Sequence, residues 1–199
     1  MKKNDLRGKH FLFPSEKLLD LAGKKVIIQV QLGKNREKME NNQQGFYGQY
    51  RTTMDSQGRI SLPSKLRAVQ GDGDKTLLSE EIVLAKGLEG CLSLYPQSEW
   101  QDVQRRLSSL HFTKRDFRFF IRRLYSSAAI LTPDKNGRIV IPDHLIDEAG
   151  LKKELLVIGV NRWIEIWNPD RYEYYLEQYS GSYEEAAERL FSGDEPKTE

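Results

Sequence analysis

The sequence has one cysteine, three histidines and no long apolar run. A single thiol, Cys91, excludes an internal disulfide. Because Cys91 lies in an apolar, strand-like segment, it is expected to be a buried apolar side chain rather than a nucleophile. No apolar stretch is long enough to span a bilayer, and the first residues lack the apolar region of a signal peptide. We therefore expect a cytoplasmic protein without a membrane partner.

Motifs of the common catalytic and metal-binding classes are also missing. His10, His111 and His144 are scattered without partner spacing, and there is no His-Glu-x-x-His, paired Cys-x-x-Cys or Gly-x-x-x-x-Gly-Lys loop. The acids of 71–74 lack the other ligands of a calcium loop. We therefore predict no catalytic residue, no metal site, no cofactor and no small-molecule substrate.

What the sequence does contain is one motif stated twice. Asp55–Pro63 (DSQGRISLP) returns as Asp134–Pro142 (DKNGRIVIP). Farther along, Cys91–Pro96 resembles Trp163–Pro169, each a short strand pattern followed by a proline that opens a helix. Two landmarks repeated in the same order indicate a duplicated domain.

The repeated turn has a purely structural interpretation. Gly58 and Gly137 are expected to supply a positive φ, which other residues adopt at a cost. Asp55 and Asp134 are expected to accept hydrogen bonds from backbone amides of the turn, or to pair with an arginine. On this interpretation the motif is a hairpin turn of a small β-module, and the short motif alone does not decide between a structural and a binding role.

The arginine beside each turn favours binding. Arg59 and Arg138 each offer a planar donor fork that fits the O6 and N7 edge of guanine and also binds phosphate. Side chains flanking the two turns are predicted phosphate contacts. They are Gln57, Lys65, Arg67 and Lys135.

Charge is distributed unevenly despite a formal net charge of +2. The stretch from Arg105 to Arg123 is strongly basic and the tail after Arg171 is acidic. A basic cluster attracts polyanions, although solvated helix faces give the same pattern.

Three helix starts are predicted from capping residues. Thr113 and Asp116 resemble a capping box for a helix over 114–126, whose apolar face of Phe117, Phe120, Ile121 and Leu124 should pack inward. Asn168 is the expected cap of the helix that begins at Pro169. Ser182 and Glu185 predict another capping box before a last short helix, after which the tail is polar.

Several motifs in order resemble the MraZ family of bacterial proteins, which carry two SpoVT/AbrB-type modules. The segments that carry the resemblance are Gly48-Gln49-Tyr50, the two Asp-x-x-Gly-Arg turns, Arg115–Phe120 (RDFRFF) and Ala149–Glu154 (AGLKKE). The resemblance covers about residues 45–179. It implies an α+β fold, a duplicated swapped-hairpin AbrB-type β-barrel that forms a pseudo-dimer in one chain, with helices packed outside.

The resemblance also implies a function. MraZ-like proteins form homo-oligomeric rings and regulate transcription, often as repressors, of the division and cell-wall gene cluster that includes their own promoter. Double-stranded DNA with short G-rich direct repeats is their partner, and the Asp-x-x-Gly-Arg loops contact it. A nucleoid-associated location follows. An antitoxin-like interaction protein is the alternative, since similar modules occur in antitoxins and the acidic tail suits a protein partner.

The expected organisation has five parts. They are an N-terminal extension (1–44), a first module (49–99), connecting basic helices (100–127), a second module (128–171), and a C-terminal helix with an acidic tail (172–199). Within the extension we expect a short helix over 16–22 and a strand over 25–32. MraZ-like sequences usually begin close to the Gly48 position, so translation from Met39 is an alternative to a genuine extension.

Overall fold

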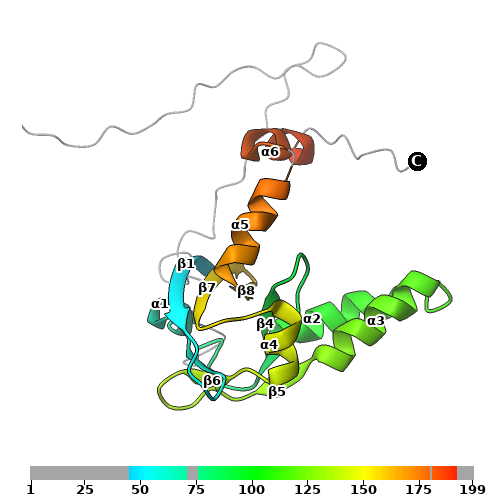
Figure 1. Cartoon of the computed structure of the whole chain (residues 1–199). Coiled ribbons are helices and arrows are strands. Elements are labelled where there is room, and N and C mark those ends of the chain that lie inside the picture. Colours follow the sequence, from blue (N-terminus) through cyan, green and yellow to red (C-terminus); the bar gives the residue numbers. More distant parts are fainter. Residues whose placement is uncertain (1–44, 71–75, 180, 192–199) are drawn as a thin grey trace, which may run out of the picture. The chain divides into compact units, whose positions relative to one another are not determined.

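The repeat in the sequence is visible as a repeated order of elements (Figure 1). The computed structural model describes residues 45–70, 76–179 and 181–191, which belong to one compact unit of the chain. The first copy consists of β1 (Phe46–Thr53), β2 (Arg59–Ser61), α1 (Ser64–Arg67), β3 (Ile82–Lys86), β4 (Leu92–Pro96), α2 (Gln97–Ser108) and α3 (Arg115–Ser127). The second consists of β5 (Ala129–Leu131), β6 (Arg138–Val140), α4 (Asp143–Ala149), β7 (Glu154–Asn161), β8 (Trp163–Trp167), α5 (Pro169–Gln178) and α6 (Tyr183–Phe191).

The two copies share one six-stranded sheet instead of forming a sheet each. Its order is β1-β7-β8-β4-β3-β5, with every neighbouring pair antiparallel. The order is symmetric about its centre, where the fourth strands of the two copies, β8 and β4, lie side by side. The first strand of each copy pairs with the third strand of the other copy. Each copy therefore depends on the other for its strand pairing.

A second, two-stranded sheet joins the copies again, and we call it the β2–β6 ribbon. Its register pairs Arg59 with Val140, Ile60 with Ile139 and Ser61 with Arg138. Beyond these pairs, the Leu62 N–H donates to the Gly137 carbonyl at 3.0 Å. In the same way, the Ile141 N–H donates to the Gly58 carbonyl at 2.8 Å. The ribbon thus has an approximate two-fold axis between Ile60 and Ile139.

The main core lies where this ribbon packs on one face of the six-stranded sheet. Ile60 and Ile139 are 1% and 2% exposed and belong to the same cluster as the inward side chains of the sheet. Strand β3 is buried on both faces: Leu84 points into this core, while Val83 packs under α2 and α3. Because successive side chains of a strand alternate between faces, such a strand reads as a continuous apolar run.

The opposite face of the sheet is covered by helices. Trp100 of α2 and Leu124 of α3 pack on β3. Trp167 at the end of β8 stacks on α5 through Tyr175, with ring centroids 5.6 Å apart. Cys91 lies in this second cluster and is 2% exposed, which confirms its expected buried role.

Local capping chemistry agrees with two of the three predicted helix starts. The Asn168 side chain accepts the Asp170 N–H at 2.9 Å. Ser182 and Glu185 form the reciprocal capping box, at 2.9 and 3.1 Å. The capping box expected at Thr113 and Asp116 is wrong: α3 begins one residue later than expected, after Lys114, and no side chain caps it. In the described segments no helix is both long and apolar enough to cross a membrane.

The inward face predicted for the helix that became α3 is formed mainly at its C-terminal end. Leu124 is 8% exposed, but Phe120 is 41% exposed, so the packing expected for Phe120 is wrong. The helix predicted for 16–22, the strand predicted for 25–32 and the polar tail after 191 lie outside the described residues.

The buried centre of the β2–β6 ribbon gives a test of the fold. Ile60→Ala and Ile139→Ala should each lower the free energy of unfolding by about 2–5 kcal/mol, because each removes core atoms and leaves a cavity. Val140→Ala is the matched control: Val140 is 53% exposed on the other face of the ribbon and should change little. Urea unfolding followed by circular dichroism measures all three, and equal effects at the three positions would contradict the described packing.

Candidate nucleic-acid interface

Each repeated turn is organised by the carboxylate of its aspartate. Asp55 Oδ1 accepts the backbone N–H groups of Gln57 at 2.9 Å and Arg59 at 3.0 Å. In the second turn Asp134 Oδ1 accepts the equivalent N–H groups of Asn136 at 2.8 Å and Arg138 at 2.9 Å. The predicted aspartate–amide bonds are therefore confirmed in both turns. They fix the backbone on which the arginine stands.

The glycine of each turn is required by its backbone geometry. Gly58 and Gly137 both have φ of 72°, as predicted, in the left-handed region. A residue from the other copy also packs against each glycine: Ile146 of α4 against Gly58, and Arg67 of α1 against Gly137. A side chain at either glycine would be strained and crowded. Each turn is thus held rigid by a helix of the opposite copy.

Arg59 is exposed and oriented by its own turn. Its Nε donates to Asp55 Oδ2 at 2.7 Å, and the side chains of Arg59 and Asp55 are 45% and 42% exposed. The bond uses only Nε, so the two terminal nitrogens of the guanidinium, Nη1 and Nη2, remain directed outward as a pair of donors. An arginine held in this way presents a bidentate fork with less loss of side-chain entropy on binding.

Arg138 occupies the equivalent exposed position, but its guanidinium is less constrained. Within the described residues its side chain forms no hydrogen bond or ion pair, and Asp134 is bound only through backbone amides. Asp134 Oδ2 is available to accept Arg138 Nε as Asp55 Oδ2 accepts Arg59 Nε. The two turns therefore share one backbone geometry and differ in the position of one side chain.

The β2–β6 ribbon brings the two arginines onto one surface. Both strands have the burial pattern exposed–buried–exposed, so Arg59 and Arg138 share the outward face with Ser61 and Val140. The arginines are diagonal neighbours across the antiparallel pair, a relation that places Cα atoms about 7–8 Å apart. The sequence indicated two arginines on two turns, whereas the structure joins them in a single site. The exposed pair Ser61 and Val140, overlooked in the sequence, lies between them.

The flanking residues predicted from the sequence fall into two groups. Gln57 and Lys135 lie in the two turns and are exposed, and Lys65 is exposed on α1. Arg67 is half-buried: its Nε donates to the Leu62 carbonyl at 3.0 Å and its aliphatic part lies on Gly137. Arg67 thus braces the second turn, a role that the local sequence did not indicate.

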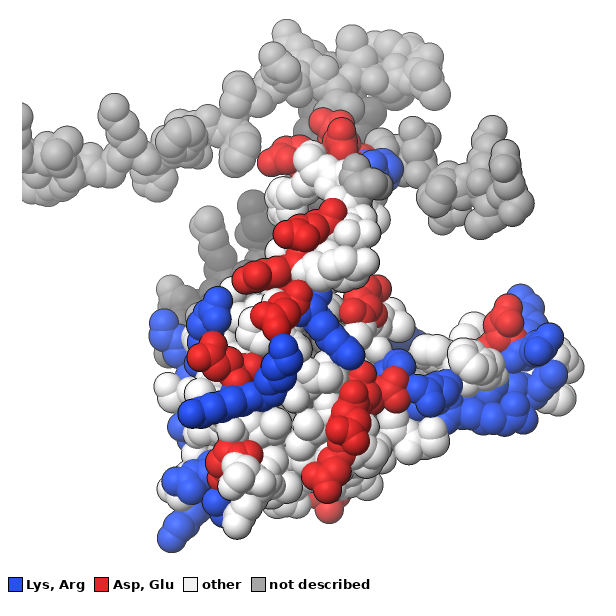
Figure 2. Space-filling model, in the orientation of Figure 1, with Lys and Arg blue, Asp and Glu red and all other residues white. Residues whose placement is uncertain are grey.

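The charged surface around the turns contains both signs (Figure 2). Lys and Arg side chains gather at the lower left of the molecule, near the loops beside β6, with Asp and Glu side chains among them. Other basic side chains lie along α3, away from the ribbon. No three His, Cys, Asp or Glu side chains lie close enough together in the described segments to hold a metal ion.

The hydrogen bonds of the turns affect the titration of the two aspartates. The Arg59 backbone N–H, and then its side chain, hold the pKa of Asp55 below its ordinary value of 3.8. The Arg138 backbone N–H is the main cause of the lowered pKa of Asp134. A carboxyl whose pKa falls on folding stabilises the folded state above its unfolded pKa, and this contribution is lost as the pH falls through the folded pKa.

A pH titration therefore tests the turns. Both aspartates should titrate below 3.8, and the amide signals of Gln57 and Asn136 should shift in the same acidic range as their acceptors become protonated. Carboxyl-detected NMR measures the two pKa values directly. Titration of either aspartate at or above 3.8 would show that its bonds to the turn are not formed in solution.

Comparison with known proteins agrees with the repeated architecture. A family model described as "MraZ protein, putative antitoxin-like" matches residues 46–123 and again 124–194. A transcriptional regulator MraZ of Heliobacterium modesticaldum is 40% identical over 149 residues, which cover 75% of this chain and 99% of that protein. The MraZ regulators of Syntrophomonas wolfei and Ligilactobacillus salivarius are 41% and 38% identical and are covered over 96% and 99% of their lengths. With both copies of the repeat matched and the relatives covered almost end to end, this chain belongs to the MraZ family.

Proposed function

We propose that this chain is a sequence-specific, DNA-binding transcriptional regulator and not an enzyme. The observation that carries the proposal is the exposed face of the β2–β6 ribbon, where Arg59 and Arg138 stand on two rigid turns. The relatives in three organisms are named transcriptional regulators, which agrees with this function.

The dimensions of the ribbon suit the major groove of DNA. That groove is about 12 Å wide and admits a two-stranded β-ribbon. Two arginines with Cα atoms about 7–8 Å apart match about two steps of 3.4 Å along one strand. Arg59 and Arg138 then read guanines, while Lys65, Lys135, Gln57 and Arg67 contact or support contact with phosphates.

A single ribbon of this kind binds weakly, so the proposed regulator acts as a ring. Each bidentate arginine–guanine pair contributes about 1–3 kcal/mol of discrimination. Several ribbons on one ring that engage evenly spaced G-rich direct repeats gain from effective concentration. The proposed target is the promoter of the division and cell-wall gene cluster that includes its own gene, and repression is the proposed sign. This activity places the protein at the nucleoid in the cytoplasm.

The finer description of the fold belongs to the same proposal. The exchange of β1 and β5 between the copies and the pairing of β2 with β6 support a swapped-hairpin AbrB-type barrel. The proposed modules are 49–99 and 128–171, joined by the basic helices of 100–127. The segment 172–199 and the extension 1–44 flank them.

An antitoxin-like interaction protein remains the second candidate. The observation in its favour is the exposed apolar side chains of α6, among them Leu190 at 81% and Phe191 at 90% exposure. A toxin gene beside this gene, and a stable complex of the two products, would support it. A cell-wall gene in that position would support the regulator.

Removing the arginines tests the regulator directly. Arg59→Ala and Arg138→Ala should each weaken binding to the promoter duplex by about 5- to 150-fold per site read, because each removes one bidentate contact. Circular dichroism and the assembly state should not change, since both side chains are exposed. Fluorescence anisotropy measures the affinity.

Arg171→Ala is the matched control, because Arg171 is an exposed arginine of α5 outside the ribbon. Unchanged affinity of both ribbon variants, or an equal loss in Arg171→Ala, would contradict the proposed interface. Loss of folding in the ribbon variants would show that the arginines are structural.

Salt dependence gives a further test of the same interface. The logarithm of the binding constant should fall linearly with the logarithm of salt concentration, with a slope of about −0.9 per phosphate contacted. Lys65→Ala and Lys135→Ala should each reduce the magnitude of the slope by about one and weaken binding to all sequences alike. A slope that neither variant changes would exclude these lysines as phosphate contacts.

A further inference from the structure

Helix α6 carries an apolar face that nothing in the described part of the chain covers. The face consists of Tyr183, Ala186, Ala187, Leu190 and Phe191, which follow the spacing of one helix side. Tyr183, Leu190 and Phe191 are 85%, 81% and 90% exposed, and no side chain of α6 is buried. A nine-residue helix is marginally stable alone in water, so this face is expected to need a partner.

The duplication shows what such a helix does when it has one. The helices α3 and α6 hold equivalent places as the last helices of the two copies. The first packs on β3 through Leu124, whereas α6 lies beyond α5 and makes no such contact (Figure 1). The second copy therefore ends in a helix without the sheet contact that the first copy has.

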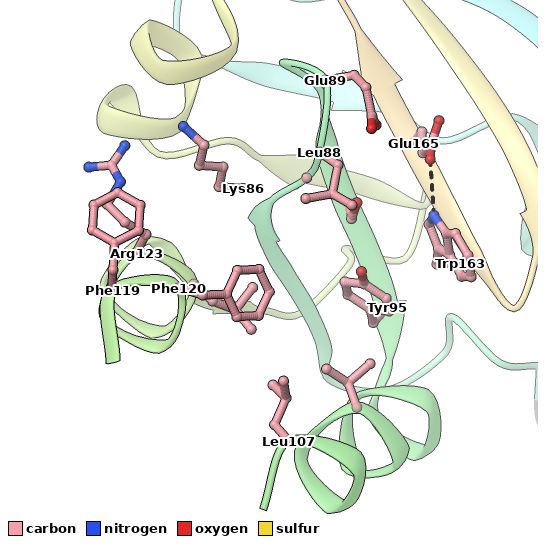
Figure 3. A pocket seen from close by; sticks show the side chains of 14 residues that line it. Lys86, Leu88, Glu89, Tyr95, Leu107, Phe119, Phe120, Arg123, Trp163 and Glu165 are labelled. Atoms are coloured by element: carbon pink, nitrogen blue, oxygen red, sulfur yellow. Dashed lines mark hydrogen bonds between the residues drawn. The ribbon is translucent and has the colours of Figure 1, made fainter. Parts of the chain in front are cut away.

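A complementary hollow lies beside α3. A cavity of about 410 Å³ opens between α2, α3 and the outer face of β3, β4 and β8 (Figure 3). Its apolar wall includes Phe119 and Phe120 of α3 and Leu88, which are 66%, 41% and 65% exposed. Tyr95 and Trp163 form part of the remaining wall, so the hollow is suited to apolar and aromatic side chains.

The two surfaces have opposite charge. Helix α3 carries four arginines against the single acid Asp116. Helix α6 carries Glu184, Glu185 and Glu188 against Arg189. Figure 2 shows basic side chains along α3 and acidic ones along α5 and α6. Opposite potentials of this kind steer association and fix its orientation.

We propose that α6 of one copy of this chain docks its apolar face into the hollow between α2 and α3 of a second copy. The contact is head-to-tail, because the two surfaces differ and each copy has one of each. A heterologous contact leaves one free surface at each end and therefore extends until a ring closes. The proposal rests on the ring of the proposed function and assigns the surfaces that form it.

Complementation between two defective variants tests the contact. Leu190→Glu spoils the apolar face of α6 and keeps the hollow, and Phe119→Glu spoils the hollow and keeps α6. Each variant alone should sediment as a single chain while the full-length parent forms a closed assembly. An equimolar mixture should form a one-to-one dimer and nothing larger, because only one good contact remains between the two.

The control is Ile130→Glu, which places the same charge at a 66% exposed apolar side chain of β5, outside both surfaces. It should assemble like the parent chain. A parent that sediments as a single chain, assembly that survives Leu190→Glu, or a mixture that does not dimerise would each overturn the proposal. Circular dichroism confirms that the variants fold.

Cross-linking locates the contact in the sequence. The variants Leu190→Cys and Phe119→Cys, mixed under mild oxidation, should give a disulfide-linked dimer that neither gives alone. The native thiol does not interfere, because Cys91 is buried and burial raises its pKa to about 12. No cross-link in the mixture would overturn the proposal, and so would a link within one chain when both cysteines are placed in it.

DNA binding separates failure of this contact from failure of the regulator. Leu190→Glu should keep weak binding to a single repeat and lose the gain in affinity on an array of repeats. Arg59→Ala should lose DNA binding and still assemble. An assembled Leu190→Glu variant with normal array binding refutes the contact alone, and an assembled Arg59→Ala variant that binds DNA normally refutes the interface alone.

Discussion

Pairing of β2 with β6 is the interaction on which the rest of the structure depends. It is only three residue pairs long, but it lies on the approximate two-fold axis, and Ile60 and Ile139 beneath it join the main core. The bonds from Leu62 to Gly137 and from Ile141 to Gly58 tie each turn to the opposite strand. The same pairing that closes the core therefore holds both arginines on the outer face. Stability and recognition use opposite faces of one ribbon.

Much of the candidate site followed from local chemistry in the sequence. The positive φ at Gly58 and Gly137 and the carboxylate bonds of Asp55 and Asp134 depend on only four or five consecutive residues, so the motif predicted them. The partner of β2 did not follow from the turn, which by itself suggests pairing within one copy. Only the resemblance to a family implied the exchange, because strand partners far apart in sequence leave no local signal.

Long-range packing also explains the misses. Arg67 was assigned to phosphate from its charge and position, whereas its contact with Gly137 arises from the crossing of the two copies. Phe120 fits the helical stripe that should pack inward, yet it lines a hollow that the chain itself leaves open. In both cases the side chain is used by a part of the structure that the local sequence does not contain.

The two copies have diverged in ways that suit different tasks. Their turns keep one geometry, while their last helices differ: α3 is basic and packed, and α6 is acidic and exposed. Divergence of this kind is expected if the copies must match at the ribbon, where they are read together, and complement each other at a contact between chains. The duplication thus supplies both a symmetric reading surface and an asymmetric assembly surface.

The most direct test of the central claim is a double-mutant cycle between Arg59 and a guanine base. Arg59→Ala is combined with replacement of one promoter guanine by 7-deazaguanine, which lacks the N7 acceptor, and affinities are measured for all four pairs. A fork that reads that guanine predicts a coupling energy of about 0.5–3 kcal/mol at one position of the repeat. Additive effects at every guanine of the repeat would contradict the account, because Arg59 would then not contact the base edges.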